Sequence, residues 1–451
     1  MIRILILTFI SAIGLQAAGS YAVLVSKATQ ADADWAAVVE ALRAKHDARV
    51  LTFDESVAEA LPALKEQFPR FTCIVAKPEE AGRIFVAKAH RLMRQFDDDP
   101  YPDTTWGIVT GYEAADALRI AKHSEPLAVK RALSGTVGSP LDAYESGRIF
   151  SELQAKAMWE KESGKDVAAA SCPQDTTKLL VDGLNTYKPD VFITSGHATE
   201  KNWQLGFSYR NGYFRCRKGQ LYGLDSAQKM HRVNSPNPKI HLPVGNCLIA
   251  HIPDRECMAL ALMRSAGVYQ MVGYTIPTGY GYGGWGVKDY FSELQAGRFS
   301  LAEAQRANQI AMNYNISMLA KDGKGIRGLS GDRDTVVLYG DPAWEARMPT
   351  RQLPWTQTLS ETDGVYTFTV TANVRGDWDN RPVVHLLPQR LANITLLAGA
   401  ELNPVIADDF ILIKFNEGIA PMKGNRGEDI PIRGDYEKGQ TFSLRFSAEP
   451  I

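Results

Sequence analysis

Short apolar runs alternate with longer stretches of helical period over the first 125 residues. The apolar runs have the length of buried strands and lie at 22–26, 50–53, 71–76 and 106–110. The helical stretches lie at 34–45, 56–67, 80–95 and 113–123. The acidic, proline-broken segment at 97–103 predicts a loop. This alternation predicts a parallel sheet covered by helices, with the first unit ending near residue 125.

A second alternating unit follows over residues 126–350. Its predicted strands lie at 132–137, 167–170, 191–194, 239–244, 268–274 and 335–339. Its predicted helices lie at 142–162, 176–186, 254–265, 287–295 and 301–319, with Asp254 as the N-cap of the third. The two units together predict an α/β protein with subdomains at 20–125 and 126–350.

Beyond Pro354 the helical period disappears. Segments with alternating apolar and polar residues take its place at 365–370, 383–387, 410–415 and 441–446, separated by Gly, Asn, Asp and Pro. About 95 residues of this pattern favour a small β-sandwich of immunoglobulin type over 355–451.

Composition and charge narrow the range of partners. The chain has 451 residues, 45% of them hydrophobic and 22% charged, and a net charge of −1. These values fit a folded protein of two or three domains. Because no basic stripe with interleaved aromatics occurs, nucleic acid and anionic membrane surfaces are not the expected partners.

The first 19 residues have the pattern of a secretory signal peptide. Arg3 precedes an apolar stretch at 4–15, and small residues follow at 17–19. We therefore expect an exported protein, located in the periplasm, on the cell surface or outside the cell. No later stretch approaches the ~20 apolar residues of a membrane helix, so no integral membrane segment is expected after signal cleavage.

A histidine and a cysteine each follow a predicted buried strand. His197 comes after the run at 191–194, and Cys247 comes after the run at 239–244. Ends of neighbouring parallel strands hold side chains at a fixed separation, and the loops beyond them bring backbone N–H groups close to a developing oxyanion. An imidazole beside a thiol promotes thiolate formation and later protonates a leaving amine. The pattern therefore predicts a Cys247–His197 catalytic dyad.

The five cysteines support this choice. Cys73, Cys172, Cys216, Cys247 and Cys257 make an odd number, so at least one thiol stays free or pairs outside the chain. Cys247 is the candidate for that free thiol. The density is too low for a disulfide scaffold, and no Cys-x-x-Cys zinc pattern occurs.

The motifs around the dyad resemble those of the gingipain family of cysteine peptidases, within the caspase-like clan. The resemblance rests on Val-Phe-Ile-Thr-Ser-Gly-His at 191–197 followed by Leu-Pro-Val-Gly-Asn-Cys at 242–247. It extends to Tyr-Pro-Asp-Thr-Thr-Trp-Gly at 101–107 with Glu-Ala-Ala at 113–115, and to the Gly-Asp-Pro turn at 340–342. It implies a caspase-like peptidase region followed by an immunoglobulin-like domain.

The resemblance also implies roles for single residues. Cys247 would be the nucleophile, His197 the general base and then acid, and the N–H groups of Ala198 and Cys247 the oxyanion donors. The chain departs from the family pattern at Ala198, where glycine is usual, and at Asn246, where a small residue is usual. These departures leave a second hypothesis open, a catalytically inactive relative that acts as an extracellular or cell-surface binding protein.

The sequence also contains candidate residues for substrate binding and for orienting His197. The aromatic, glycine-rich run at 274–285 places Tyr274, Tyr280, Tyr282 and Trp285 as a possible substrate-binding rim. Glu145 and Asp166 are candidates to orient His197. Protein or peptide substrates would be hydrolysed through a thioester, and a transpeptidase or amidase would use the same acyl-enzyme.

Metal binding is an alternative for two sets of residues. His251 lies four residues after Cys247, and with His197 or His241 the pair could hold zinc, although Pro253 places His251 in a loop. Acidic residues Asp97–Asp99 could hold calcium, as acidic loops do in gingipains. The dyad chemistry itself requires no cofactor and no metal.

Overall fold

The computed structural model describes residues 21–278, 281–321, 327–375, 381–415 and 436–451. The predicted signal peptide at 1–19 lies outside these residues. No helix in the described ranges is long and apolar enough to cross a membrane.

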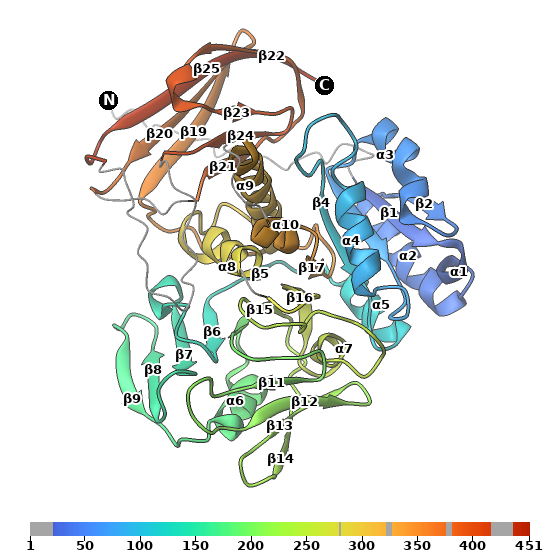
Figure 1. Ribbon diagram of the computed structural model, residues 1–451, viewed down its shortest axis with the longest axis vertical. Helices are drawn as coiled ribbons and strands as arrows, with labels where there is room; N and C mark the ends of the chain where they lie inside the picture. The colour runs from blue at the N-terminus through green and yellow to red at the C-terminus, as the bar shows by residue number, and fades with distance from the viewer. Residues whose placement is uncertain (1–20, 279–280, 322–326, 376–380, 416–435) are drawn as a thin grey trace, which may run out of the picture.

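A twelve-stranded sheet runs through residues 21–339 (Figure 1). Its first part consists of four parallel neighbours in the order β2-β1-β3-β4: β1 (Tyr21–Ser26), β2 (Arg49–Phe53), β3 (Phe71–Val75) and β4 (Thr105–Val109). The accompanying helices are α1 (Lys27–Gln30), α2 (Ala33–His46), α3 (Leu61–Gln67), α4 (Arg83–Leu92) and α5 (Ala114–Lys122). Every residue of β1 and β4 is buried, as expected for a parallel sheet covered on both faces.

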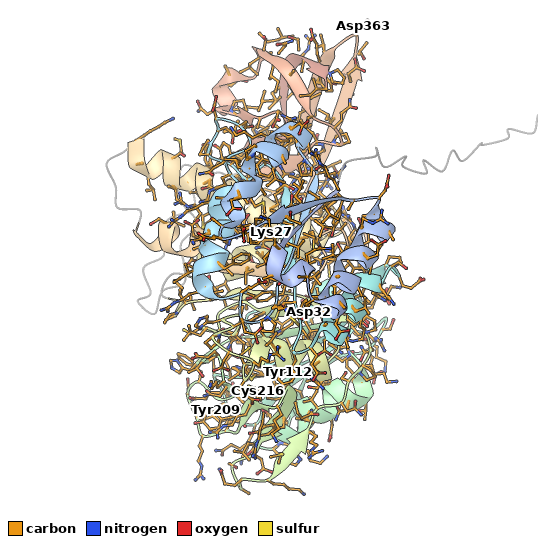
Figure 2. The ribbon with its side chains drawn as sticks, turned by 90° about the vertical axis from the view of Figure 1, so that its right-hand side faces the viewer. Lys27, Asp32, Tyr112, Tyr209, Cys216 and Asp363 are labelled. Carbon is orange, nitrogen blue, oxygen red and sulfur yellow. The ribbon has the colours of Figure 1, made fainter. Side chains whose placement is uncertain are left out.

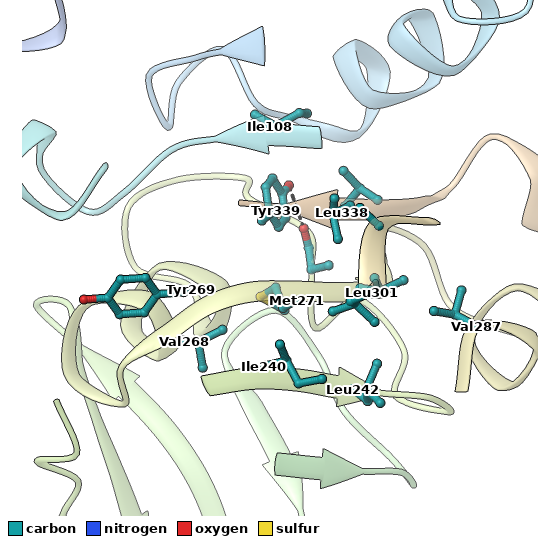
Figure 3. Close-up of a cluster of buried hydrophobic side chains, with 14 of the residues drawn as sticks. Ile108, Ile240, Leu242, Val268, Tyr269, Met271, Val287, Leu301, Leu338 and Tyr339 are labelled. Carbon is teal, nitrogen blue, oxygen red and sulfur yellow. Dashed lines mark hydrogen bonds between the residues drawn. The ribbon is translucent and has the colours of Figure 1, made fainter. Parts of the chain in front are cut away.

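The second part of the sheet contains five parallel neighbours: β6 (Arg131–Ser134), β7 (Ser146–Phe150), β10 (Val191–Thr194), β15 (Lys239–Pro243) and β16 (Val268–Tyr274). Strand β17 (Val336–Tyr339) joins the two parts, antiparallel to β16 and parallel to β4. Figure 3 shows Leu338 and Tyr339 of β17 between Met271 of β16 and Ile108 of β4. The large, mainly parallel sheet predicted from the sequence is thus confirmed, and the two predicted units share it.

The predicted helix at 142–162 is wrong. This segment forms a 3₁₀ turn (Leu141–Ala143), β7 and β8 (Ala157–Lys161), and β9 (Ala168–Ser171) follows at the sheet edge. A Cβ at Gly147 would lie 2.5 Å from Leu141 Cδ2 and 3.1 Å from the Ala132 carbonyl oxygen. The glycine therefore allows β7 to pair closely with β6, and this pairing overrides the helical period of the segment.

A small antiparallel sheet was not foreseen. It contains β11 (Asn202–Gln204), β12 (Tyr213–Arg217), β13 (Gln220–Leu224) and β14 (Met230–Arg232). Helices α6 (Thr177–Asp182) and α7 (Met258–Ser265) contact β13. Helix α7 begins after Cys257 and not after Asp254, whose carboxylate instead accepts a hydrogen bond from the Glu256 N–H.

Three further helices follow β16. They are α8 (Tyr282–Lys288), continued by a π-helical turn (Asp289–Glu293), α9 (Leu301–Lys321) and α10 (Arg327–Arg333). Two short strands, β5 (Leu127–Ala128) and β18 (Ala346–Arg347), pair with each other.

The C-terminal region forms two further sheets. One has four strands, β19 (Trp355–Thr362), β20 (Val365–Ala372), β25 (Thr441–Pro450) and β22 (Leu391–Ala398), and the other has three, β21 (Val383–Leu386), β24 (Phe410–Ile413) and β23 (Val405–Ile406). Phe368 and Leu444 from the first sheet share a core with Ile411 and Ile413 from the second. The other face of the three-stranded sheet packs beside α9 (Figure 1).

A buried carboxylate links the turn after β17 to strand β1 and helix α2. Asp341 accepts hydrogen bonds from the Tyr21 hydroxyl at 2.7 Å, Lys45 Nζ at 2.8 Å and His46 Nε2 at 2.8 Å. Burial alone would raise the pKa of Asp341, but the hydrogen bond and charge of His46, with the charge of Lys45, hold this pKa well below its usual range. Asp341 is the acidic residue of the Gly-Asp-Pro turn.

We expect Asp341→Ala to lower the free energy of unfolding by ~3–5 kcal/mol, because Lys45 is left without its buried partner. Asp54→Ala removes the exposed ion pair with Lys27 and should cost at most ~1 kcal/mol; Lys27 lies at the surface in Figure 2. Because the pKa of Asp341 is lowered, its stabilisation is present above about pH 4 and is lost as the pH falls towards the folded-state pKa. Equal urea midpoints for the two variants at pH 7 would contradict this role.

Candidate active site

The two candidate catalytic residues follow adjacent strands. Strands β10 and β15 pair in parallel, with Val191 opposite Ile240 and Thr194 opposite Pro243. All residues of both strands are buried. The loops at 195–198 and 244–247 therefore leave the sheet at the same edge, the arrangement that the two apolar runs predict.

Asn246 connects these two loops. Its side-chain amide donates to the Gly196 carbonyl oxygen at 2.9 Å, and its Oδ1 accepts from the Thr194 hydroxyl at 2.5 Å. The residue is fully buried. Asn246, the residue before Cys247, is thus bonded directly to Gly196, the residue before His197.

His197 is exposed at the start of a short hairpin. Its carbonyl oxygen accepts from the Gln204 N–H at 2.9 Å. Its imidazole stacks on Phe207, with ring centroids 4.7 Å apart and planes 22° apart. Sequence reasoning missed Phe207, because the stack depends on how this hairpin folds back.

Neither carboxylate proposed to orient His197 is placed to do so. Glu145 precedes β7 and forms an ion pair with Lys130 at 3.0 Å, and it lines a cavity of about 490 Å³ together with Asp166. The residues before β7 lie at the amino edge of the parallel strands, whereas His197 lies at their carboxyl edge. We therefore discard both residues as partners of the imidazole.

Cys247 is partly buried at the end of the second loop. Its thiol donates to the Thr278 carbonyl oxygen at 3.9 Å. Within the described residues, the thiol contacts this carbonyl and forms no hydrogen bond with His197. The conformation places the two groups on neighbouring loops with the thiol turned towards the segment that follows β16.

The backbone at Ala198 is suited to donate an N–H. Ala198 pairs with Trp203 in an isolated antiparallel bridge, flanked by hydrogen bonds from Thr199 to Asn202 and from Gln204 to His197. Ala198 and Trp203 thus form a non-hydrogen-bonded pair, in which the N–H group of Ala198 points away from the opposite strand. The left-handed conformation in this loop falls on Gly196, with φ 95°, so a methyl group at position 198 is tolerated.

The other four thiols are poor nucleophiles. All five cysteines are free. Burial raises the pKa of Cys73 and Cys172, and it raises the pKa of Cys216 and Cys257 to about 12. These thiols therefore stay protonated at neutral pH.

Two of the predicted rim tyrosines are buried in the interior. The Tyr274 hydroxyl donates to Asp332 at 3.1 Å and accepts from the Gly284 N–H, while the Tyr282 hydroxyl accepts from Asn315 Nδ2 at 2.7 Å. Neither ring reaches a substrate surface, so this part of the prediction is wrong. Tyr280 lies outside the described residues.

Trp285, from the same run, lies next to the loop that carries Cys247. A Cβ at Gly138 would lie 2.4 Å from its Cη2, and a Cβ at Gly245 would lie 3.5 Å from its Nε1. Trp285 therefore contacts both the loop after β6 and the loop that carries Cys247, and side chains larger than hydrogen at position 138 would displace it.

The zinc alternative finds no support in the geometry. His241 is buried, stacks on Phe192 and bonds the Thr194 hydroxyl, and burial lowers its pKa to about 3. His251 lines a separate cavity of about 420 Å³ with residues that follow β2 and β3. Among the described residues, the group of potential metal ligands consists of Asp97, Asp99 and Asp103, with no histidine or cysteine.

Comparison with known proteins gives a structural similarity only. No family model matches the chain, and no curated protein matches it. The structure is similar to that of the Arg-specific cysteine proteinase gingipain R (RgpB), with a TM-score of 0.43 and 13% identity over 89% of this chain and 93% of that one. It is also similar to the complex of Porphyromonas gingivalis RgpB pro- and mature domains, with a TM-score of 0.44, 13% identity and coverage of 89% and 94%. Gingipains are the family that the sequence motifs resemble.

Asn246→Ala should destabilise the protein by ~1–3 kcal/mol, since the Gly196 carbonyl loses its donor. It should also change the rate at which Cys247 is alkylated, because the loop before the thiol is released. Asn313→Ala is a matched control: this buried amide bonds the Gln309 carbonyl oxygen inside α9. If both variants alkylate Cys247 at the wild-type rate, Asn246 has no role in placing the thiol.

The aspartate cluster predicts a pH-dependent response to calcium. Burial, with Asp97 and Asp409 nearby, raises the pKa of Asp103 to about 8. An unfolded aspartate has a pKa of about 3.9, so the folded state loses stability as the pH rises from about 4 to 8. Asp103→Asn should flatten this decline in Tm measured in EDTA, and calcium at pH 8 should raise the wild-type Tm more than that of the variant. A slope and a calcium response that the substitution leaves unchanged would exclude the site.

Proposed function

We propose that the protein is an exported cysteine peptidase that hydrolyses protein or peptide substrates. The observation that carries the proposal is the pairing of β10 with β15, which brings the loops of His197 and Cys247 to one sheet edge, where Asn246 joins them. A nucleophile and its base require this kind of fixed, shared edge.

In the proposed reaction the Cys247 thiol turns from Thr278 towards His197 and gives its proton to the imidazole. The thiolate attacks the substrate carbonyl carbon. The oxyanion formed in that step accepts hydrogen bonds from the N–H groups of Ala198 and Cys247, neither of which donates to another group within the described residues.

The intermediate then collapses to a thioester. The imidazolium of His197 protonates the leaving amine, which departs with the C-terminal half of the substrate. Water, deprotonated by His197, hydrolyses the thioester and regenerates the thiol. His197 is exposed, so both the leaving amine and the incoming water can reach it.

The remaining parts of the chain fit an exported enzyme. The seven described C-terminal strands in two sheets with a shared core support an immunoglobulin-type sandwich over 355–451. This region contacts the peptidase-like region directly, since the Gln295 side-chain amide donates to the Val384 carbonyl oxygen at 2.7 Å and accepts from its N–H at 3.1 Å. The apolar stretch at 4–15 supports export.

A second candidate function is that of an inactive relative that binds extracellular partners. The observation in its favour is the orientation of the thiol, which bonds Thr278 while the imidazole stacks on Phe207. In this alternative the two groups never meet, and the loops serve as a binding surface.

Alkylation and hydrolysis separate the two candidates. Purified mature protein should hydrolyse a peptide library, and Cys247→Ala or His197→Ala should lower this activity at least ~10³-fold without changing the circular dichroism spectrum. Cys216→Ala, which removes the other partly exposed thiol, should leave it unchanged. Iodoacetamide should label Cys247 at pH 7 faster in wild type than in His197→Ala, because the imidazole promotes thiolate formation. Hydrolysis that survives Cys247→Ala would overturn the proposal.

A further inference from the structure

The loop after β7 and the loop that carries Phe207 are held together by hydrogen bonds. The backbone carbonyl oxygen of Glu152, in the loop after β7, accepts hydrogen bonds from the N–H groups of Phe207 at 2.7 Å and Ser208 at 3.3 Å. The Tyr209 hydroxyl donates to the Ser151 carbonyl oxygen at 2.6 Å. Figure 2 labels Tyr209 in the same lower part of the molecule as Cys216. The backbone of Leu153, the residue after Glu152 in the chain, therefore lies close to that of Phe207.

Both apolar residues at this junction are exposed. Leu153 is 52% exposed and Phe207 is 41% exposed. Phe207 also stacks on the imidazole of His197. Exposed apolar side chains close to a reactive group offer an apolar surface to a substrate bound there.

These two loops offer no exposed carboxylate to a basic side chain. Segments 151–156 and 205–211 contain one carboxylate, Glu152. That carboxylate is buried and turned inward, where it accepts the Thr136 hydroxyl at 2.5 Å and the Val137 N–H at 2.9 Å. It therefore offers no charge to a substrate cation, and the charged side chains exposed on these two loops, Lys156 and Arg210, are both basic.

We infer that Leu153 and Phe207 form an apolar shelf that binds the side chain directly after the scissile bond. The inference rests on the proposed function, in which His197 protonates the leaving amine and so faces the leaving half of the substrate. Phe207 stacks on that imidazole, so it lies next to the leaving half of the substrate. The substrate class is peptides with an aliphatic or aromatic residue at this position.

The test uses fluorogenic peptides that differ only in the residue after the scissile bond: leucine, phenylalanine, glycine, lysine or aspartate. Wild type should prefer leucine and phenylalanine over lysine by about tenfold or more in kcat/KM, the range that an apolar contact provides. Leu153→Lys should reduce this preference to about threefold or less. Leu397→Lys is the matched control, since Leu397 is also 52% exposed but lies in β22.

Binding to the Cys247→Ala variant tests the shelf without turnover. Fluorescence polarisation should show tighter binding of the leucine peptide than of the lysine peptide, and adding Leu153→Lys should remove the difference. Absence of hydrolysis by wild type would overturn the peptidase, while this binding difference would still establish the shelf. Hydrolysis with no apolar preference, or a preference that Leu153→Lys leaves intact, would overturn the shelf and leave the peptidase standing.

Discussion

The hydrogen bonds of Asn246 join two loops that the pairing of β10 with β15 brings together. One loop ends in His197 and the other in Cys247, fifty positions apart in the chain. The strand pair fixes where each loop begins, and the buried amide fixes how the loops sit relative to each other. Every chemical role proposed for this edge, from proton transfer to oxyanion binding, depends on that geometry, because reacting groups must approach within hydrogen-bond reach.

Buried hydrogen bonds also connect distant segments away from this edge of the sheet. The Gly-Asp-Pro turn looks like a mere sequence signature, yet its aspartate is the acceptor for Tyr21, Lys45 and His46 from the first unit. Its glycine has φ 121°, and a Cβ there would lie 2.2 Å from the Tyr269 carbonyl oxygen. Both residues are thus required by packing between distant elements. A residue pattern that resembles a family can therefore persist for structural reasons, whether or not the site is active.

Much of the framework follows from the sequence. The apolar runs at 191–194 and 239–244 correspond closely to β10 and β15, because buried parallel strands are continuous hydrophobic segments. The small sheet of β11 to β14 was missed, since its strands have only three to five residues and most of their positions are not buried. The rim tyrosines were misplaced because their hydroxyl partners, Asp332 and Asn315, come from segments that only the fold brings near. Phe207 and Glu152 gave no local signal for the same reason.

The most direct measurement is to treat the wild-type protein with a peptide that carries a thiol-reactive electrophile at the scissile position, and to map the adduct by mass spectrometry. We expect a single adduct on Cys247 in the wild-type protein, and slow or undetectable formation of this adduct in the His197→Ala variant. An adduct on another cysteine, or labelling of Cys247 at the same rate without the imidazole, would contradict it.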